Sequence, residues 1–136
     1  MADLAQLSYD PNFVFDVELR GPDGAPLLND DGSQMTWGIF GVDSDIAIKA
    51  RNAVTNRYLR QRGRAQVTAE SSLADQCSQL ARISARWNVT MGGSKPPFSQ
   101  DEALKLLLNP GFAFIRDQLQ EAHEDRANFS KGSSPS

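Results

Sequence analysis

Residues 98–129 read FSQDEALKLLLNPGFAFIRDQLQEAHEDRANF, and this stretch predicts two amphipathic helices with their own start and stop signals. Ser99 and Glu102 have the spacing of a capping box, in which each side chain binds a free backbone amide at the start of a helix. Asn109 and Pro110 interrupt the apolar pattern, because asparagine caps a helix and proline suits its first turn. Neither helix can bury an apolar stripe alone, so both need another surface to pack against.

The apolar residues of these two helices recur at helical spacing, which predicts one buried stripe on each. The first stripe comprises Leu104, Leu107 and Leu108, and the second comprises Phe112, Ile115, Leu119 and Ala122. The opposite side of the second helix is acidic. We expect water to surround Asp117, Glu121, Glu124, Asp125 and the neighbouring His123.

Two further helices are predicted upstream. Asp43-Ser44-Asp45 caps the first, which runs to about Gln61, with Gly63 as its stop signal. Its stripe comprises Ile46, Ala50, Val54 and Tyr58, widened by Ala53. The second helix is predicted from near Thr68 to Trp87, with Leu73, Cys77, Leu80, Ser84 and Trp87 in register.

The residues before Asp43 follow the two-residue period of strands. Phe13, Phe15, Val17 and Leu19 alternate with polar residues, a short strand is expected at Ala25–Leu28, and a third at Thr36–Val42. Turn-forming residues separate the three segments. The fold class predicted is therefore α+β: a small N-terminal antiparallel β-meander (13–42), then a bundle of about four α-helices (43–129), in one domain (13–129). A loose lead (1–12) and a disordered polar tail (130–136) flank it.

Composition argues against catalysis. The 136 residues include one cysteine, Cys77, and one histidine, His123. A thiolate metal cluster needs several such ligands, and a catalytic triad needs a histidine beside a nucleophile. Cys77 lies in an apolar stripe and is interpreted as a small buried hydrophobe. We therefore expect no enzyme activity, no cofactor and no metal.

Charge is unevenly distributed along the chain. Met1–Ile48 carries nine acidic residues against Arg20, whereas Lys49–Arg86 carries eight basic residues against Glu70 and Asp75. The run Arg57, Arg60, Arg62 and Arg64 could contact phosphates, but the acidic overall balance and the lack of a nucleic-acid motif favour a solvated or protein-facing surface.

Several short motifs, in their order and spacing, resemble the small tail assembly chaperones of long-tailed bacteriophages. The motifs are Phe40–Asp45 (FGVDSD), Trp87 at the end of Leu80–Trp87, Pro97-Phe98-Ser99 with Glu102-Ala103, Ile115–Gln118 (IRDQ) and Asp125–Phe129 (DRANF). The resemblance covers about Val17 to Phe129. It implies a non-enzymatic protein that binds and shields the phage tape measure protein during tail assembly, in the cytoplasm of the host cell.

The resemblance also implies partners. They are the tape measure protein, possible further copies of this chain, and the major tail tube protein through an extended frameshift product; nucleic acid and membrane are not among them. The alternative is a structural tail or adaptor subunit that stays in the virion. Mass spectrometry of purified particles separates these two functions.

Six residues are expected to contact the partner: Tyr58, Trp87, Phe112, Arg126, Asn128 and Phe129. Phe129 has two interpretations. It either closes the end of the last helix against the body of the domain, or it is an aromatic anchor for the partner.

Overall fold

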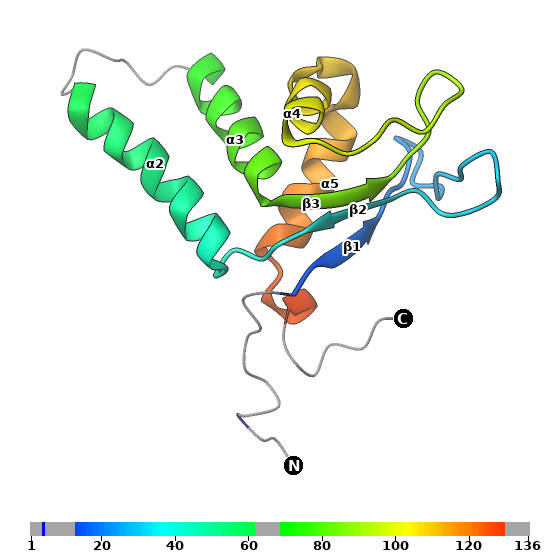
Figure 1. Cartoon of the computed structure of the whole chain (residues 1–136), viewed down its shortest axis with the longest axis horizontal. Coiled ribbons are helices and arrows are strands. Elements are labelled where there is room, and N and C mark those ends of the chain that lie inside the picture. The colour runs from blue at the N-terminus through cyan, green and yellow to red at the C-terminus, as the bar shows by residue number, and fades with distance from the viewer. Residues whose placement is uncertain (1–3, 5–12, 62–68, 130–136) are drawn as a thin grey trace.

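Three short strands form one antiparallel sheet in the computed structural model of the chain (Figure 1). The structure describes residue 4 and residues 13–61 and 69–129, without the side chains of residues 58, 61 and 69–71. The strands are β1 (Phe15–Glu18), β2 (Thr36–Ile39) and β3 (Ser84–Asn88), and β2 lies in the middle. The sheet therefore places two strands from the first third of the chain beside one strand from its middle.

The alternating pattern gives the sheet one buried and one exposed face. Val17 on β1 and Trp37 and Ile39 on β2 are buried in the core. Asp16 on β1 and Arg86 on β3 lie on the other face. Their side chains form an ion pair across β2, from Arg86 Nη2 to Asp16 Oδ2, over 2.8 Å.

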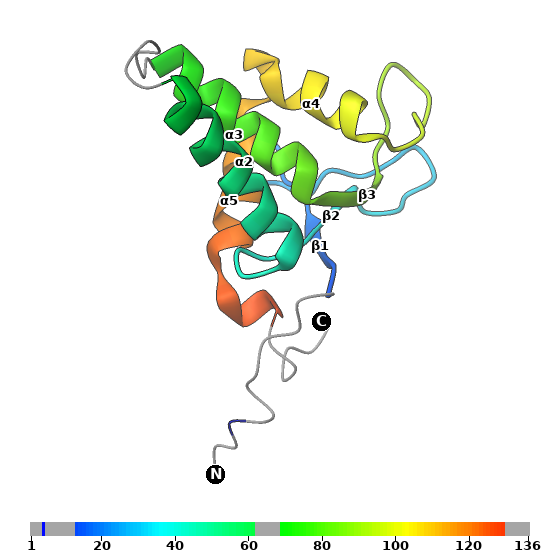
Figure 2. The same ribbon diagram turned by 60° about the vertical axis from the view of Figure 1, so that its left-hand side comes forward.

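Within residues 13–61 and 69–129, four α-helices and two 3₁₀ turns complete the fold. They are α2 (Asp45–Gln61), α3 (Ala69–Ile83), α4 (Gln100–Leu108), η1 (Pro110–Phe112), α5 (Ala113–Glu124) and η2 (Arg126–Phe129). Helix α5 contacts β1 and β2, while α3 contacts the other three α-helices. Helix α3 thus lies at the centre of the helical layer. In Figure 2, α4 lies on the side of α3 that is opposite to α2.

The predicted α+β class is confirmed, with a three-stranded antiparallel sheet and four α-helices in the described residues. The positions of two elements were predicted wrongly. The helix expected to end at Trp87 ends at Ile83, and Ser84–Asn88 is strand β3 instead. Ser84 makes this change of structure possible. Its hydroxyl donates to the Leu80 carbonyl (2.7 Å) at the helix end and accepts from Trp37 Nε1 (2.8 Å) on the neighbouring strand.

The strand predicted at Ala25–Leu28 is therefore not one of the three strands of the sheet. That segment makes isolated bridges, Arg20 to Pro26 and Leu28 to Gln34, beyond the end of β1. The central strand β2 instead gains β3 as its second partner, and Trp37 faces Trp87 across that pair. The two indole rings pack edge to face with centroids 5.0 Å apart. This aromatic contact is a long-range stabilisation that helical spacing alone does not reveal.

Both predicted capping residues of the C-terminal helices act as caps, but the second α-helix begins three residues later than expected. Ser99 Oγ accepts from the Glu102 amide (3.1 Å), and Asn109 Oδ1 accepts from the Gly111 amide (2.9 Å). Pro110 starts the 3₁₀ turn η1, and α5 follows from Ala113. The buried stripe of α4 differs from the prediction, because it comprises Ala103, Leu106 and Leu107, whereas Leu108 is 45% exposed.

No helix in the described part of the chain is long and apolar enough to cross a membrane. The predicted lead, the polar tail and the helix signals at Gly63 and Thr68 lie outside the described residues.

Candidate partner-binding surface

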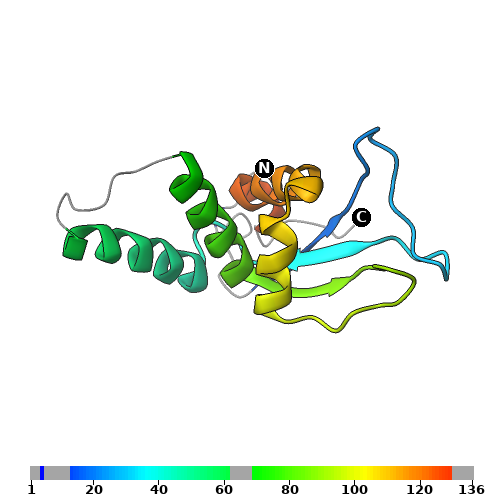
Figure 3. The same cartoon turned by 90° about the horizontal axis from the view of Figure 1, so that it is seen from above.

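Helix α2 is an arm that leaves the body of the domain. It contacts α3, and the two helices diverge from the point where α2 begins and α3 ends (Figure 1). Seen from above, α2 lies on the side of α3 that faces away from the strands (Figure 3). Among its described side chains, those buried are Ala47 and Ala50. Two alanines bury little apolar surface, so this 17-residue helix is only lightly held.

The base of the arm is fixed by polar contacts. Ser44 is fully buried; its hydroxyl donates to the Gly41 carbonyl (2.8 Å) and accepts from the Ala47 amide (3.1 Å). Arg51 Nη1 donates to the Val42 carbonyl (2.6 Å). Further along the arm, Arg57 forms an ion pair with Asp75 of α3. The start of α2 is therefore ordered by specific hydrogen bonds, while its outer side carries no such contacts to the described residues.

Large apolar side chains are exposed along the arm. Ile46 and Ile48 are each 39% exposed, and Leu59 is 65% exposed. Ile48 and Leu59 are eleven residues apart and so lie within about 20° of each other around a helix of 3.6 residues per turn. Leu73, near the start of α3, is also 38% exposed. Exposed apolar side chains gathered on one element are typical of a protein-binding surface.

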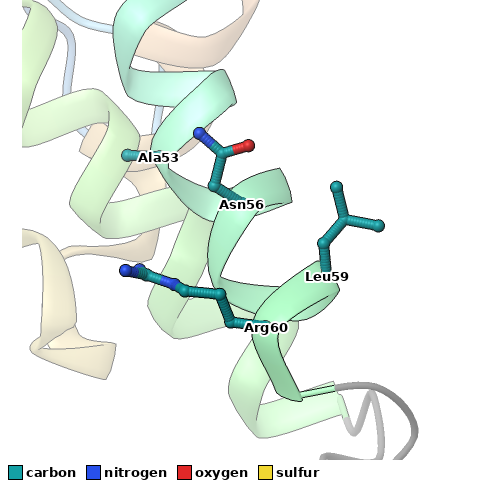
Figure 4. A pocket seen from close by; sticks show the side chains of 4 residues that line it. All are labelled: Ala53, Asn56, Leu59 and Arg60. Carbon is teal, nitrogen blue, oxygen red and sulfur yellow. The ribbon is translucent and has the colours of Figure 1, made fainter.

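A broad hollow of about 600 Å³ lies along the outer half of the arm. Its described lining residues are Ala53, Asn56, Leu59 and Arg60, all from α2 (Figure 4). In Figure 4, Leu59 and Arg60 point to different sides of the helix. The hollow thus combines an apolar side chain, an amide and a cation, which suits a peptide surface better than a buried small molecule.

A second, smaller cleft of about 190 Å³ lies at the base of the arm, between α2, α3 and α5. Its apolar lining comprises Val42, Ala47, Ala50, Leu80 and Ile83. Its polar lining comprises Arg51, Gln79, Gln120, His123 and Glu124. Gln120 Nε2 donates to Glu124 Oε1 (2.7 Å), so two of these polar groups are already paired. Side chains from three helices therefore converge on one space.

His123 is buried in the wall of this cleft, which corrects the prediction that it faces water. It is 8% exposed, and Nδ1 lies 2.8 Å from the Phe40 carbonyl oxygen. Burial lowers the pKa of His123 below its usual range, and Arg51 acts in the same direction, while the Phe40 carbonyl, Glu124 and Asp43 oppose the change. The neutral ring is thus favoured. The spacing Ile115, Leu119, His123 was the available signal, because it places the histidine on the buried stripe.

The residues expected to contact a partner have mostly structural contacts. Trp87 is half-buried, and its Nε1 donates to the Pro96 carbonyl (2.9 Å). Phe112 is half-buried beside Phe114, with ring centroids 6.3 Å apart. Tyr58 belongs to α2, and its side chain lies outside the described part of the structure.

The C-terminal signature packs against the base of the arm. Arg126 Nε donates to Asp43 Oδ2 (2.7 Å), and Asn128 Nδ2 donates to the Ala122 carbonyl (3.1 Å). Phe129 is fully buried, and its ring meets those of Phe13 and Phe15 edge to face at 6.4 and 6.0 Å. This burial agrees with the first interpretation of Phe129, a contact that closes the helix end. An anchor for a partner would have to leave the core.

The other candidate groups are the lone cysteine and the arginine run. Cys77 is fully buried, its Sγ lies 3.4 Å from the Leu107 carbonyl oxygen, and burial raises the pKa of its thiol. Across the described residues, no group of three or more histidine, cysteine and acidic side chains could hold a metal ion. Of the arginine run, Arg57 is paired with Asp75 and Arg60 is exposed, while Arg62 and Arg64 lie outside the described residues.

Comparison of the chain with protein-family models, with curated proteins and with solved structures gives no match.

Proposed function

We propose that this protein is a non-enzymatic tail assembly chaperone of a long-tailed bacteriophage, which binds the tape measure protein in the host cytoplasm and shields its apolar surface until the tail tube forms. The observation that carries the proposal is the arm: a helix whose fully buried side chains, among those described, are two alanines, with Ile48 and Leu59 exposed on one side. A surface of this kind suits an amphipathic helix, which would lay its own apolar stripe along α2.

The charge on the arm indicates what kind of helix it would bind. Helix α2 contains Lys49, Arg51, Arg57 and Arg60 against Asp45. A partner helix with acidic residues beside its apolar stripe would be attracted to the net positive charge of this helix. A long helical partner offers many such segments, so several copies of the chaperone could bind it, each weakly.

Two of the motifs behind the family resemblance also meet in space, which is compatible with the same function. The Phe40–Asp45 motif contacts the C-terminal signature (Asp125–Phe129) through the Asp43–Arg126 ion pair, and the Phe40 carbonyl also contacts His123 in the preceding helix. Residues 83 positions apart thereby build one structure, the base of the arm. In this proposal the motifs position the arm, and the exposed side of α2 binds the partner.

The test is co-expression of this chain with the tape measure protein of the same phage, followed by affinity purification and native mass spectrometry. We expect a complex with several copies of this chain, and none of the chain in purified virions. A stoichiometric place in finished tails would overturn the proposal in favour of a structural tail or adaptor subunit.

A pair of matched variants tests the surface. Leu59→Asp places a charge on the arm, whereas Leu28→Asp places one on a turn of the sheet region; the two leucines are 65% and 59% exposed. Neither change opens the core, so both variants should fold. We expect Leu59→Asp to reduce capture of the tape measure protein at least about tenfold, as for a hot-spot residue, and Leu28→Asp to leave it unchanged. Equal capture by both variants would exclude the arm as the binding surface.

A further inference from the structure

Strand β1 is an edge of the sheet, and its backbone groups alternate between the β2 side and the free side. Leu19, directly after the strand, donates to the Met35 carbonyl (3.0 Å) on the β2 side. Because alternate residues bond the partner in an antiparallel pair, Val17 also faces β2, whereas Asp16 and Glu18 direct their N–H and C=O groups to the free edge. These backbone groups of Asp16 and Glu18 have no hydrogen-bond partner among the described residues. An edge of this kind is open to another strand.

The same edge already binds an amide at the next residue that faces it, Arg20. Gln118 of α5 accepts from the Arg20 N–H (2.8 Å) and donates to the Arg20 carbonyl (2.7 Å). Its side-chain amide thus makes both bonds that a residue of an added strand would make in an antiparallel pair. This contact closes the edge at Arg20 and leaves Asp16 and Glu18 as the open part.

Acidic side chains flank the open part of the edge. Asp16 and Glu18 are exposed, and their side chains lie on the face of the sheet opposite to buried Val17. Asp16 accepts from Arg86 Nε (2.9 Å) and Nη2 (2.8 Å), so this face accommodates a basic side chain. Glu18 forms no ion pair with the described residues. A strand with a basic side chain opposite Glu18 would gain a cross-strand ion pair.

A second copy of this chain is a poorer occupant of the edge. Antiparallel pairing of two β1 strands, centred on the open part, places Asp16 of one copy opposite Asp16 or Glu18 of the other. Like charges directly opposite each other are destabilising. The charge of the edge therefore favours a basic segment of a different protein.

We infer that the open edge of β1 is a docking site for an extended segment of a protein partner that carries lysine or arginine at alternate positions. The segment would add to the sheet as an antiparallel strand, with main-chain bonds to Asp16 and Glu18 and a basic side chain opposite Glu18. In Figure 3, α2 and β1 lie on opposite sides of α3, so this site is separate from the arm. The inference goes beyond the proposed function and does not depend on it.

The experiment uses the full chain labelled with ¹⁵N and three capped six-residue peptides at millimolar concentration. The first peptide alternates lysine with valine, and the second alternates glutamate with valine. The third is the lysine peptide with an N-methyl group on each lysine, which removes the N–H groups that would bond the edge. We expect the lysine peptide to shift the amide signals of Asp16 and Glu18 and to slow the hydrogen exchange of these amides.

The affinities of the three peptides separate charge from main-chain bonding. The lysine peptide should bind about three to ten times more tightly than the glutamate peptide, as for charge pairs across strands. It should bind at least about fivefold more tightly than the N-methylated peptide, as for the loss of two net hydrogen bonds. Equal affinity for the lysine peptide and either control, no binding, or shifts elsewhere on the chain would overturn the inference.

A pair of matched variants locates the charge. Glu18→Lys changes the open edge, whereas Asp30→Lys changes a turn whose neighbour Asn29 donates to the Asn88 carbonyl of β3 (3.3 Å). Glu18 and Asp30 are both exposed, and the amide spectrum reports whether each variant is folded. We expect Glu18→Lys to reverse the preference, so that the glutamate peptide binds more tightly, and Asp30→Lys to retain the preference for lysine. The same change of preference in both variants would show that only net charge matters and would reject the site.

The peptide-free protein provides the last control. Protection of the Asp16 and Glu18 amides that increases with protein concentration would place a second copy at the edge and would contradict the inference. Capture of the tape measure protein is measured on the arm, so the failure of either proposal leaves the other standing.

Discussion

Arg126 Nε donates to Asp43 Oδ2 over 2.7 Å, and this ion pair joins the C-terminal turn η2 to a residue two positions before the arm. A second bond joins Arg126 Nη2 to Asp43 Oδ1 (3.3 Å). The pair lowers the pKa of the Asp43 carboxyl. Both side chains are partly exposed, at 70% and 40%, so water screens much of their attraction.

We expect Arg126→Ala to lower the free energy of unfolding by up to about 1 kcal/mol, the upper range for an exposed ion pair. Urea denaturation at low and high salt measures this, and the difference from the unaltered protein should shrink as salt rises. Lys49→Ala is the control, because Lys49 forms no ion pair with the described residues. A double-mutant cycle with Asp43→Asn isolates the coupling. A coupling of zero would mean that the pair does not hold the turn.

Phe129→Ala distinguishes the two interpretations of the C-terminal aromatic residue. Its ring is fully buried against Phe13 and Phe15, so we expect a loss of about 3–5 kcal/mol of stability. Thermal and urea unfolding give the value, and Phe129→Leu should lose clearly less. An unchanged stability combined with lost binding of a partner would instead identify Phe129 as an anchor.

Gly38→Ala tests the exposed face of the sheet. A Cβ atom at this position would lie 2.8 Å from Arg86 Cγ, from Asp16 Oδ1 and from Val14 Cγ1. We expect a loss of about 1–3 kcal/mol, as for overpacking, measured by urea denaturation. Adding Arg86→Ala to this variant removes one of the clashing side chains and should restore part of the stability. If the double variant is as unstable as the sum of the single ones, the ion pair across Gly38 is not the cause.

The stability of the protein should fall as the pH drops below about 6.5, the usual pKa of histidine. The pKa of His123 is lowered in the folded state, so the unfolded chain binds a proton at a higher pH than the folded chain does. Unfolding is therefore favoured as the pH falls from the unfolded pKa towards the folded one. Burial is the main cause of the lowered pKa of His123; the charge of Arg51 adds to it, while the Phe40 carbonyl, Glu124 and Asp43 oppose it.

The measurement is the urea midpoint between pH 7.5 and 5. His123→Asn should show a smaller slope over the same range, because its side chain does not titrate. An identical slope in both proteins would assign the acid sensitivity to other groups.

The sequence predicted the fold class and the local signals well, and it predicted long-range partners poorly. Caps such as Ser99 and Asn109 act within a few residues, so their patterns are visible in the sequence. The change from α3 to β3 at Ser84 depends on Trp37, which lies 47 positions earlier. A helical period continued through Ser84 and Trp87, and the contact between distant strands overrode it.

The candidate site was less visible than the fold for the same reason. To predict the exposed side of the arm, one must know which residues of α2 contact α3, and the sequence indicated only one apolar stripe on α2. The cleft could not be predicted because it forms only where three helices come together. His123 was assigned to the acidic side of its helix because its neighbours in the sequence are acidic. Its spacing from Leu119 was the better guide, since that leucine is fully buried.

The two tryptophans of the chain, Trp37 and Trp87, lie in contact within the sheet, and Phe98 adjoins the second at 5.3 Å. Coupled indoles of this kind give a distinct near-ultraviolet circular dichroism signal, and neither lies on α2. The near-ultraviolet circular dichroism of the tryptophans will thus report the pairing of β2 with β3, but it will not report movement of the arm. A fluorophore on the arm would be the complementary reporter.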